Sequence, residues 1–481
     1  MNIFAYSSFC LLAIISLLSI PTLQAQDSGY RIEVQVDSFP HQQLYLAHFY
    51  GGQPRFLDTV KRNDQQQFVF EGADLFYPGI YLIVLPPRNQ AIQIVLDEAD
   101  QTFQVKANAK AIVADQIHFE GSEANTHFYR YLVELREKRK ELADMRAYSK
   151  LLAGKEKAKH EKKMRKQITK IRDYQERMVN KSPGTPAALM SGIDREPLFP
   201  DFEGSEKEIQ QQRFAYQRQH FFDELDIQNS QLSYTPLFYS KVNFYVSKMT
   251  VQEPDSVCQA IDQVLELFSV DTTNYRALIT YFTKRYKQPR VVGMDEVYVY
   301  IYDQYYKTGK VHWLNDELMK SVEVQAEKFR PVLIGKTAPD IEVQRKDGSS
   351  IRLHEIDSDY TVLYFWRPGC GHCKKATPNV KAFYQVYQDL GVEILSVCTQ
   401  HGEGVQSCWD YVAENELEEW IQAVDPYHRS RFIQKFNAQR TPKIYVLDRD
   451  KKILLKDFKA ENLPEVMDRL MREHPPKKES E

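Results

Sequence analysis

The feature that most constrains the fold of this chain is a pair of cysteines, Cys370 and Cys373, separated by Gly371 and His372. The apolar run 361–365 stands just ahead of them and predicts a buried strand. The Cys-x-x-Cys spacing then places both thiols on the first turn of the helix that follows. Two thiols in this position can alternate between a dithiol and a disulfide, so the segment predicts a redox-active strand-helix unit.

The two cysteines are expected to have different roles. Cys370 would lie at the amino end of the helix, where free backbone N–H groups and the helix dipole stabilise a thiolate, so we expect it to be the attacking nucleophile. Cys373 lies one turn further along and faces inward, and we expect it to resolve the mixed disulfide. His372 either stabilises the thiolate or is simply a solvent-facing helix residue, and both interpretations remain open.

The sequence around the cysteines predicts one α/β domain over residues 332–475. Strands alternate with helices there, and a strand hairpin and a closing helix follow. Such an order predicts a mixed sheet with helices on both faces. The expected strands are 361–366, 392–397, 443–447 and 453–458, and the expected helices are 370–388, 404–415 and 463–473.

A second motif, Thr441-Pro442, stands just before the predicted strand that begins at Lys443. Together with the Cys-x-x-Cys after a buried strand, it resembles the active-site helix and the cis-proline loop of the thioredoxin superfamily. The resemblance implies that Pro442 is cis and lies against the two sulfurs. It also implies that the backbone of Thr441 pairs with an extended segment of the substrate.

Within that superfamily, the segment 334–340 and the Phe365-Trp366 lead-in are similar to the TlpA/ResA branch of exported thiol-disulfide oxidoreductases. Some members of this branch carry β and helical domains of unknown function ahead of the thioredoxin-like domain. The resemblance covers residues 334–473 and implies an enzyme that exchanges disulfides with protein substrates. It also implies an electron donor or acceptor in the cell envelope.

Several positions depart from the pattern of these relatives. Gly369 replaces the usual Trp before the first cysteine, and Tyr364 replaces the buried acid of cytosolic thioredoxins. Ala376 stands where ResA-like proteins carry a Glu, so no carboxylate is identified that would handle the proton of the resolving thiol. The dipeptide Gly371-His372 matches protein disulfide isomerase. We therefore expect it to modulate the pair toward a more oxidising potential than that of thioredoxin, about −180 rather than about −270 mV.

The remaining cysteines leave several interpretations open. Cys398 and Cys408 either form a second disulfide or are two unpaired thiols, since sequence alone gives no geometry. Cys398 and His401 could also suggest a zinc site, but a Cys-x-x-Cys on a strand-helix turn fits redox chemistry better, and no metal is expected. Cys258 stands beside a helical apolar stripe and is expected to be buried and inert.

The amino-terminal part of the chain predicts a signal peptide and two further domains. Residues 1–25 combine an apolar stretch with a small-residue cleavage site, and the alternative is an uncleaved membrane anchor. Residues 26–121 alternate apolar and polar positions between turn signals, which predicts an antiparallel β-sandwich. Residues 122–331 have helical periodicity and predict an α-helical domain. The tail 476–481 is expected to be disordered.

These observations predict an exported thiol-disulfide oxidoreductase of the periplasm or cell envelope that needs no cofactor. The net charge of −3, from 63 basic and 66 acidic residues, gives no general reason to expect nucleic acid. One alternative is a peroxiredoxin-like thiol peroxidase, although the Pro-x-x-x-Thr/Ser-x-x-Cys pocket it needs is missing around Cys370. Another is a non-enzymatic envelope binding protein whose carboxy-terminal domain is a passenger.

Overall fold

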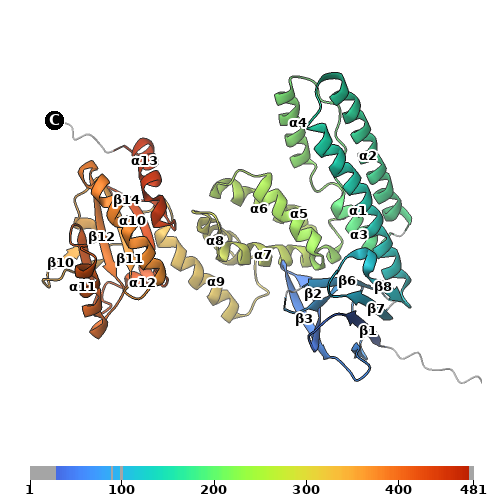
Figure 1. The fold of residues 1–481 in the computed structure, drawn as a ribbon, viewed down its shortest axis with the longest axis horizontal. Helices are drawn as coiled ribbons and strands as arrows, with labels where there is room; N and C mark the ends of the chain where they lie inside the picture. Colours follow the sequence, from blue (N-terminus) through green and yellow to red (C-terminus); the bar gives the residue numbers. More distant parts are fainter. Residues whose placement is uncertain (1–28, 88–89, 98–100, 182, 476–481) are drawn as a thin grey trace, which may run out of the picture. The chain divides into compact units, whose positions relative to one another are not determined.

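The computed structural model describes residues 29–475 apart from 88–89, 98–100 and 182, so the predicted signal peptide and tail lie outside it. Sheets come first in the chain, then helices, then a sheet covered by helices (Figure 1), which confirms the predicted multidomain fold class. The chain divides into two compact units. One extends to Ala47 and continues over Phe56–Leu152, and the other joins His48–Arg55 to the residues from Ala153 onward.

Two four-stranded sheets form the amino-terminal part, in the orders β4-β1-β7-β8 and β3-β2-β5-β6. Their strands are β1 (Tyr30–Asp37), β2 (Gln43–Tyr50), β3 (Gln53–Lys61), β4 (Phe68–Gly72), β5 (Gly79–Leu85), β6 (Gln90–Leu96), β7 (Thr102–Asn108) and β8 (His118–Glu120). Strand β1 pairs antiparallel with β4 but parallel with β7, so the prediction of a purely antiparallel arrangement is wrong. Alternation of apolar residues reveals strands and their buried faces, but not the direction of a neighbour that is distant in sequence.

Helix α1 (Glu123–Ser149) begins where the predicted helical region begins. The side chain of Ser122 accepts a hydrogen bond from the Asn125 backbone N–H, as an N-cap should. The Asn125 side chain also bonds the backbone N–H and C=O of Val95 at 2.7 and 2.8 Å, which attaches α1 to strand β6. By its contacts α1 belongs to the first compact unit, and the predicted domain boundary at residue 122 stays a prediction.

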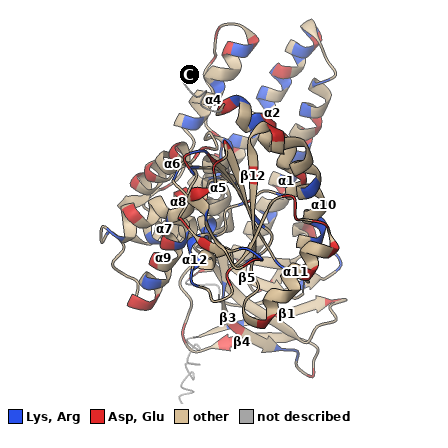
Figure 2. Cartoon of the chain, turned by 90° about the vertical axis from the view of Figure 1, so that its left-hand side faces the viewer, with Lys and Arg blue, Asp and Glu red and all other residues tan. Residues whose placement is uncertain are grey.

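The helices that follow build a second core. They are α2 (Gly154–Lys181), α3 (Pro186–Asp194), α4 (Glu206–Gln219), α5 (Pro236–Lys248), α6 (Pro254–Leu267), α7 (Thr272–Lys287), α8 (Asp295–Ile301) and α9 (Asp316–Phe329). Aromatic and aliphatic side chains from α5 to α9 fill it, including Phe238, Ile261 and Phe282. Lys and Arg residues follow one another along α2 (Figure 2), where few side chains are buried. None of the helices in the described ranges has the length and apolar character of a membrane span.

The carboxy-terminal domain is a seven-stranded sheet in the order β10-β9-β13-β12-β11-β14-β15. The strands are β9 (Glu342–Gln344), β10 (Ser350–Arg352), β11 (Tyr360–Trp366), β12 (Val392–Cys398), β13 (Ile421–Val424), β14 (Lys443–Asp448) and β15 (Ile453–Lys456). The helices are α10 (Gly371–Tyr387), α11 (Val405–Glu414), α12 (Phe432–Lys435) and α13 (Leu463–Glu473). The strands and helices expected for this domain are all present, whereas the four-residue elements β13 and α12 were not predicted.

Strand β11 lies at the centre of this sheet and is buried along its whole length. Alternate side chains enter two different apolar cores, with Val362 and Tyr364 in one and Leu363 and Phe365 in the other. A strand that is covered on both faces has a continuous run of apolar residues. This run allowed β11 to be predicted from the sequence. Its neighbour β12 runs parallel and β14 antiparallel.

A buried ion pair links strand β15 to helix α8. The Lys456 ammonium contacts the Asp295 carboxylate and also donates a hydrogen bond to the Val332 carbonyl. The two side chains are only 2% and 7% exposed. A buried charge that has lost its partner is far more costly than an exposed one, so this pair constrains how the carboxy-terminal domain meets the helices before it.

We predict that Lys456→Met destabilises the protein by about 3–5 kcal/mol, because it leaves the Asp295 carboxylate buried and unpaired. The measurement is chemical unfolding followed by circular dichroism. Lys459→Met is the matched control, since Lys459 is 79% exposed in its pair with Glu461 and should change the midpoint little. The double variant Lys456→Met with Asp295→Leu should recover most of the loss. Equal midpoints for Lys456→Met and Lys459→Met would contradict the prediction.

Candidate active site

The turn between β11 and α10 places Cys370 at the helix N-cap. The chain leaves β11 at Trp366 and reaches Cys370 through Gly369, whose φ of +76° lies in the left-handed region that favours glycine. This conformation gives a physical reason for glycine at this position. The Cys370 sulfur accepts a hydrogen bond from the Cys373 backbone N–H at 3.4 Å, in the way a Ser or Asp caps a helix.

The loop before β14 brings Thr441 and Pro442 to the same place. Because β14 runs antiparallel to β11, its start at Lys443 lies beside the end of β11. The Thr441–Pro442 peptide bond is cis, as the resemblance implied. The Thr441 carbonyl lies 3.4 Å from the Cys370 sulfur and accepts its hydrogen bond. Residues that are far apart in the sequence therefore meet around one sulfur atom.

The two thiols lie in different environments. Partial burial acts to raise the pKa of Cys370, but hydrogen bonds outweigh it and the pKa is lowered. Those hydrogen bonds come from the thiol and the backbone N–H of Cys373, from the side chain of Thr441 and from the backbone of His372. Cys373 is 1% exposed, and burial together with its neighbour Cys370 raises its pKa to about 11. Cys370 is therefore the thiol of the pair that ionises more readily.

The residues between the cysteines are open to solvent. Gly371 and His372 are both exposed on the first turn of α10. The His372 imidazole makes no hydrogen bond to any residue that the structure describes, and its contribution to Cys370 comes from the backbone. The sequence left two interpretations of His372 open, and its exposure leaves the imidazole available to a bound substrate.

Behind Cys373 lies a buried group of hydroxyls. Thr377 donates a hydrogen bond to the Cys373 carbonyl at 3.0 Å and accepts one from Tyr411 at 3.4 Å. Tyr364 is 2% exposed, and its hydroxyl has no partner at full hydrogen-bond geometry among the described residues, although the Thr377 side chain lies close enough to influence its pKa. Burial raises the pKa of Tyr364, so it stays a neutral phenol. The Tyr364 hydroxyl is thus a buried donor without a well-formed hydrogen bond among the described residues.

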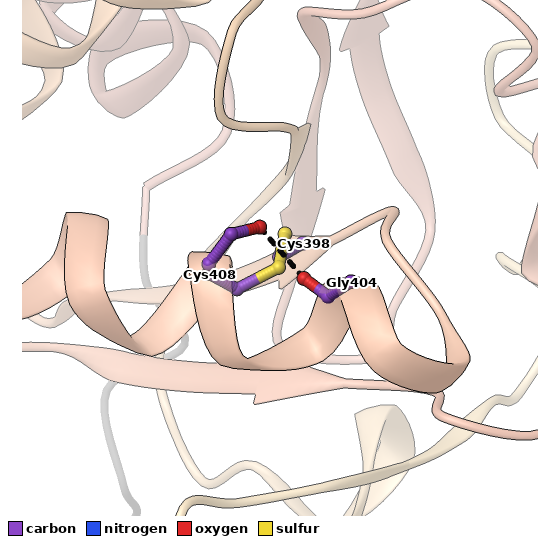
Figure 3. The surroundings of a disulfide bond; sticks show 4 residues. Cys398, Gly404 and Cys408 are labelled. Atoms are coloured by element: carbon purple, nitrogen blue, oxygen red, sulfur yellow. Dashed lines mark hydrogen bonds between the residues drawn. A yellow bond between two sulfur atoms is a disulfide. The ribbon is translucent and has the colours of Figure 1, made fainter.

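A disulfide lies beside the redox pair in the same apolar core. Figure 3 shows that it joins Cys398, the last residue of β12, to Cys408 in α11. The two Cα atoms are 6.2 Å apart, within the range for a disulfide, and both residues are buried. Of the two alternatives left open by the sequence, the structure contains the disulfide. Within the described residues, no group of three or more His, Cys, Asp or Glu side chains could hold a metal ion.

Cys258 lies far along the chain from this site. It is 6% exposed on helix α6, and burial followed by the nearby charge of Asp262 raises its pKa to about 12. Such a thiol is unreactive at neutral pH, as the sequence predicted. Outside the redox pair, the loop after β13 was not predicted, because strand β13 itself was not predicted. This loop could have been found from the general rule that α/β proteins place their sites at the carboxyl ends of parallel strands.

The fold and the site define a thioredoxin-like domain of the thiol-disulfide oxidoreductase class. Residues 334–456 match the family model described as the AhpC/TSA family. Residues 30–128 and 206–328 match two domains of unknown function, DUF4369 and DUF5106. These matches follow the predicted order of a β region, a helical region and a redox domain.

Named relatives agree with this class. The chain is 27% identical over 123 residues to the thiol-disulfide oxidoreductase ResA of Bacillus cereus, covering 26% of this chain and 68% of the relative. It is 36% identical over 66 residues to ResA of Geobacillus thermodenitrificans, covering 14% and 38%. The predicted resemblance to thioredoxin-like thiol-disulfide oxidoreductases, and with it the predicted enzyme class, is confirmed.

Solved structures are also similar to parts of the chain. A thioredoxin-like protein from Bacteroides caccae is 17% identical and covers 58% of this chain and 98% of that chain, with a TM-score of 0.46. A thiol:disulfide interchange protein from Bacteroides sp. is 22% identical and covers 30% and 94%, with a TM-score of 0.28.

We predict that reduced protein is alkylated by iodoacetamide at Cys370 much faster than at Cys373. Because the pKa of Cys370 is lowered, its reactive thiolate forms at a lower pH than that of an ordinary thiol. Cys373 should begin to react only as the pH approaches its pKa of about 11. Peptide mapping by mass spectrometry across a pH series measures both rates, with Cys258 as the unreactive control. Equal rates at neutral pH would contradict the assigned environments.

We also predict that Tyr364→Phe leaves the protein as stable as the wild type, or more stable by about 1–2 kcal/mol. The substitution removes a buried hydroxyl without a partner, and an unsatisfied buried donor costs about 1–3 kcal/mol. Chemical unfolding of the oxidised protein is the measurement. Tyr445→Phe is the control, because the Tyr445 hydroxyl donates to the Phe436 carbonyl and its loss should be destabilising. A loss for Tyr364→Phe as large as that for Tyr445→Phe would show that the Tyr364 hydroxyl is bonded.

Proposed function

We propose that this protein exchanges disulfides with proteins of the cell envelope, with Cys370 as the nucleophile and Cys373 as the resolving thiol. The observation that carries the proposal is the asymmetry between the two thiols. Cys370 is partly exposed at a helix N-cap and has a lowered pKa, whereas Cys373 is buried and its pKa is raised to about 11. Sequential attack and resolution need this division of roles.

In the reducing direction, the Cys370 thiolate attacks one sulfur of a substrate disulfide. A new S–S bond joins Cys370 to the substrate, and the other substrate sulfur leaves as a thiolate that takes up a proton. Cys373 then gives up its proton and attacks the Cys370 sulfur, which releases the second substrate thiolate. The substrate has gained two electrons, and the enzyme ends as a Cys370–Cys373 disulfide. A donor thiol pair must then reduce it, and the oxidising direction runs the same steps in reverse.

The surrounding residues support binding of an extended substrate segment. The backbone of Thr441, held next to the Cys370 sulfur, would pair with that segment, and cis Pro442 would lie beneath it. Gly371 and His372 would modulate the potential of the pair, because they form the exposed turn between the two sulfurs. No cofactor is required, since thiol-disulfide exchange moves electrons within S–S bonds.

The proposed compartment is the periplasm or cell envelope. The Cys398–Cys408 disulfide supports it, because disulfides persist in oxidising compartments and are rare in the cytosol. The predicted signal peptide over residues 1–25 supports the same compartment. We propose protein thiols and disulfides of the envelope as the substrates, and an envelope protein as the electron donor or acceptor.

Disulfide exchange is preferred to the two alternatives for specific reasons. A thiol peroxidase needs a pocket that activates peroxide beside a single nucleophile, and the chain lacks the Pro-x-x-x-Thr/Ser-x-x-Cys sequence around Cys370. A passenger domain would have no use for a thiol of lowered pKa that caps a helix and contacts the Thr441 carbonyl. Binding by the amino-terminal domains would be compatible with exchange, and would select where the enzyme acts.

We predict that the mature protein catalyses reduction of insulin disulfides by dithiothreitol. Cys370→Ser should lose the activity, because no nucleophile remains, and Cys258→Ser is the control that should keep it. Cys373→Ala should accumulate mixed disulfides at Cys370, because resolution is lost. Precipitation of insulin and non-reducing electrophoresis measure the two effects. Wild-type activity equal to that of Cys370→Ser would refute the enzyme proposal.

A further inference from the structure

The loops around the redox pair form one continuous edge of the sheet. Strands β11, β12 and β13 run parallel, so the segments that follow them emerge at the same edge, and β14 begins there. Hydrogen bonds tie the segments together. The Thr399 N–H donates to the Trp366 carbonyl at 2.8 Å, and the Gly402 N–H donates to the Pro426 carbonyl at 3.1 Å.

The charged side chains of this edge are nearly all basic. The exposed acidic residue in these segments is Glu403. None of the exposed basic residues there forms an ion pair with a residue that the structure describes, although Lys and Arg pairs are frequent elsewhere in the chain. The chain as a whole carries a net charge of −3, so this accumulation is local. We call the basic residues the basic rim, and they are Arg367, Lys374, Lys375, Arg429, Arg431 and Arg440.

Acidic groups near the basic rim are already engaged. Asp457 pairs with Lys443, and Asp340 pairs with Arg352. The Asp425 carboxylate is buried and accepts hydrogen bonds from the backbone N–H groups that follow it in its own loop. The positive charge of the rim is therefore not cancelled by these carboxylates.

Aromatic and imidazole groups accompany the charges. Tyr427 is 71% exposed, and the Arg429 guanidinium lies 4.9 Å from the centre of its ring. The rings of His401 and His428 lie 4.2 Å apart, from the loops after β12 and β13. An exposed tyrosine among arginines is typical of the residues that dominate binding energy in protein interfaces.

We propose that the basic rim is a docking surface for an acidic segment of the partner protein whose disulfide or thiol reacts at Cys370. The inference rests on the proposed function and names the substrate class for that site. A partner polypeptide is the occupant because the rim lies at the same edge of the sheet as Cys370, whose proposed substrates are protein thiols and disulfides. Complementary charge steers association and raises the rate of encounter, with a strong dependence on salt.

The test uses two synthetic peptides with the same disulfide-bonded loop, one flanked by Glu and the other by Lys. Fully reduced protein is mixed with each peptide, and the single-turnover rate of peptide reduction is measured. At low ionic strength the Glu peptide should react about tenfold faster or more. The difference should nearly vanish at about 1 M salt, where charges are screened over about 3 Å.

A charge-reversal variant locates the effect. Arg429→Glu should reduce the preference for the Glu peptide several-fold. Lys346→Glu, in the exposed turn between β9 and β10 at the other end of the sheet, changes the net charge equally and should leave the preference unchanged. Equal rates for both peptides at low salt, or equal effects of the two variants, would overturn the inference while the proposed function stands. Reduction of neither peptide would overturn the proposed function as well.

Discussion

The site depends on one backbone hydrogen bond, from the Cys373 N–H to the Cys370 sulfur. It makes Cys370 the cap of helix α10, so the sulfur faces the free N–H groups at the helix terminus. The same geometry turns Cys373 inward to the core, where its pKa rises to about 11. One local constraint thus produces the difference between the two thiols from which we propose their roles as nucleophile and resolving thiol. The buried strand β11 fixes where this cap lies, and the loop at Thr441 completes it from the other side.

Much of this site could be predicted from the sequence because its parts are local. A buried strand, a two-thiol turn and a Thr-Pro before a strand each leave a short pattern, and the structure joins them at Cys370. What could not be predicted depends on pairing between distant segments. The parallel partner of β1 and the strand Ile421–Val424 are examples, since direction and short edge pairings leave no periodic signal. The bond between Cys398 and Cys408 also required coordinates.

The departures from the relatives now have physical descriptions. Gly369 adopts a backbone conformation that suits glycine, and Tyr364 supplies a neutral, unpaired hydroxyl behind the resolving thiol instead of a carboxylate. Among the residues that the structure describes, none of the groups that shift the pKa of Cys373 is a carboxylate. The basic rim lies at the same edge of the sheet as this pair. The domains of unknown function ahead of it lie in the regions that the sequence predicted to be β and helical.

The most direct test of the account is the redox state of the cysteines in a series of glutathione buffers, read by mass spectrometry after acid quenching and alkylation. The account predicts that Cys370 and Cys373 convert together and reversibly between two thiols and one disulfide. The midpoint should lie nearer to the value of about −180 mV for protein disulfide isomerase than to the value of about −270 mV for thioredoxin. Cys398 and Cys408 should stay bonded throughout. A pair that remains as two free thiols at every ratio of oxidised to reduced glutathione would contradict the account.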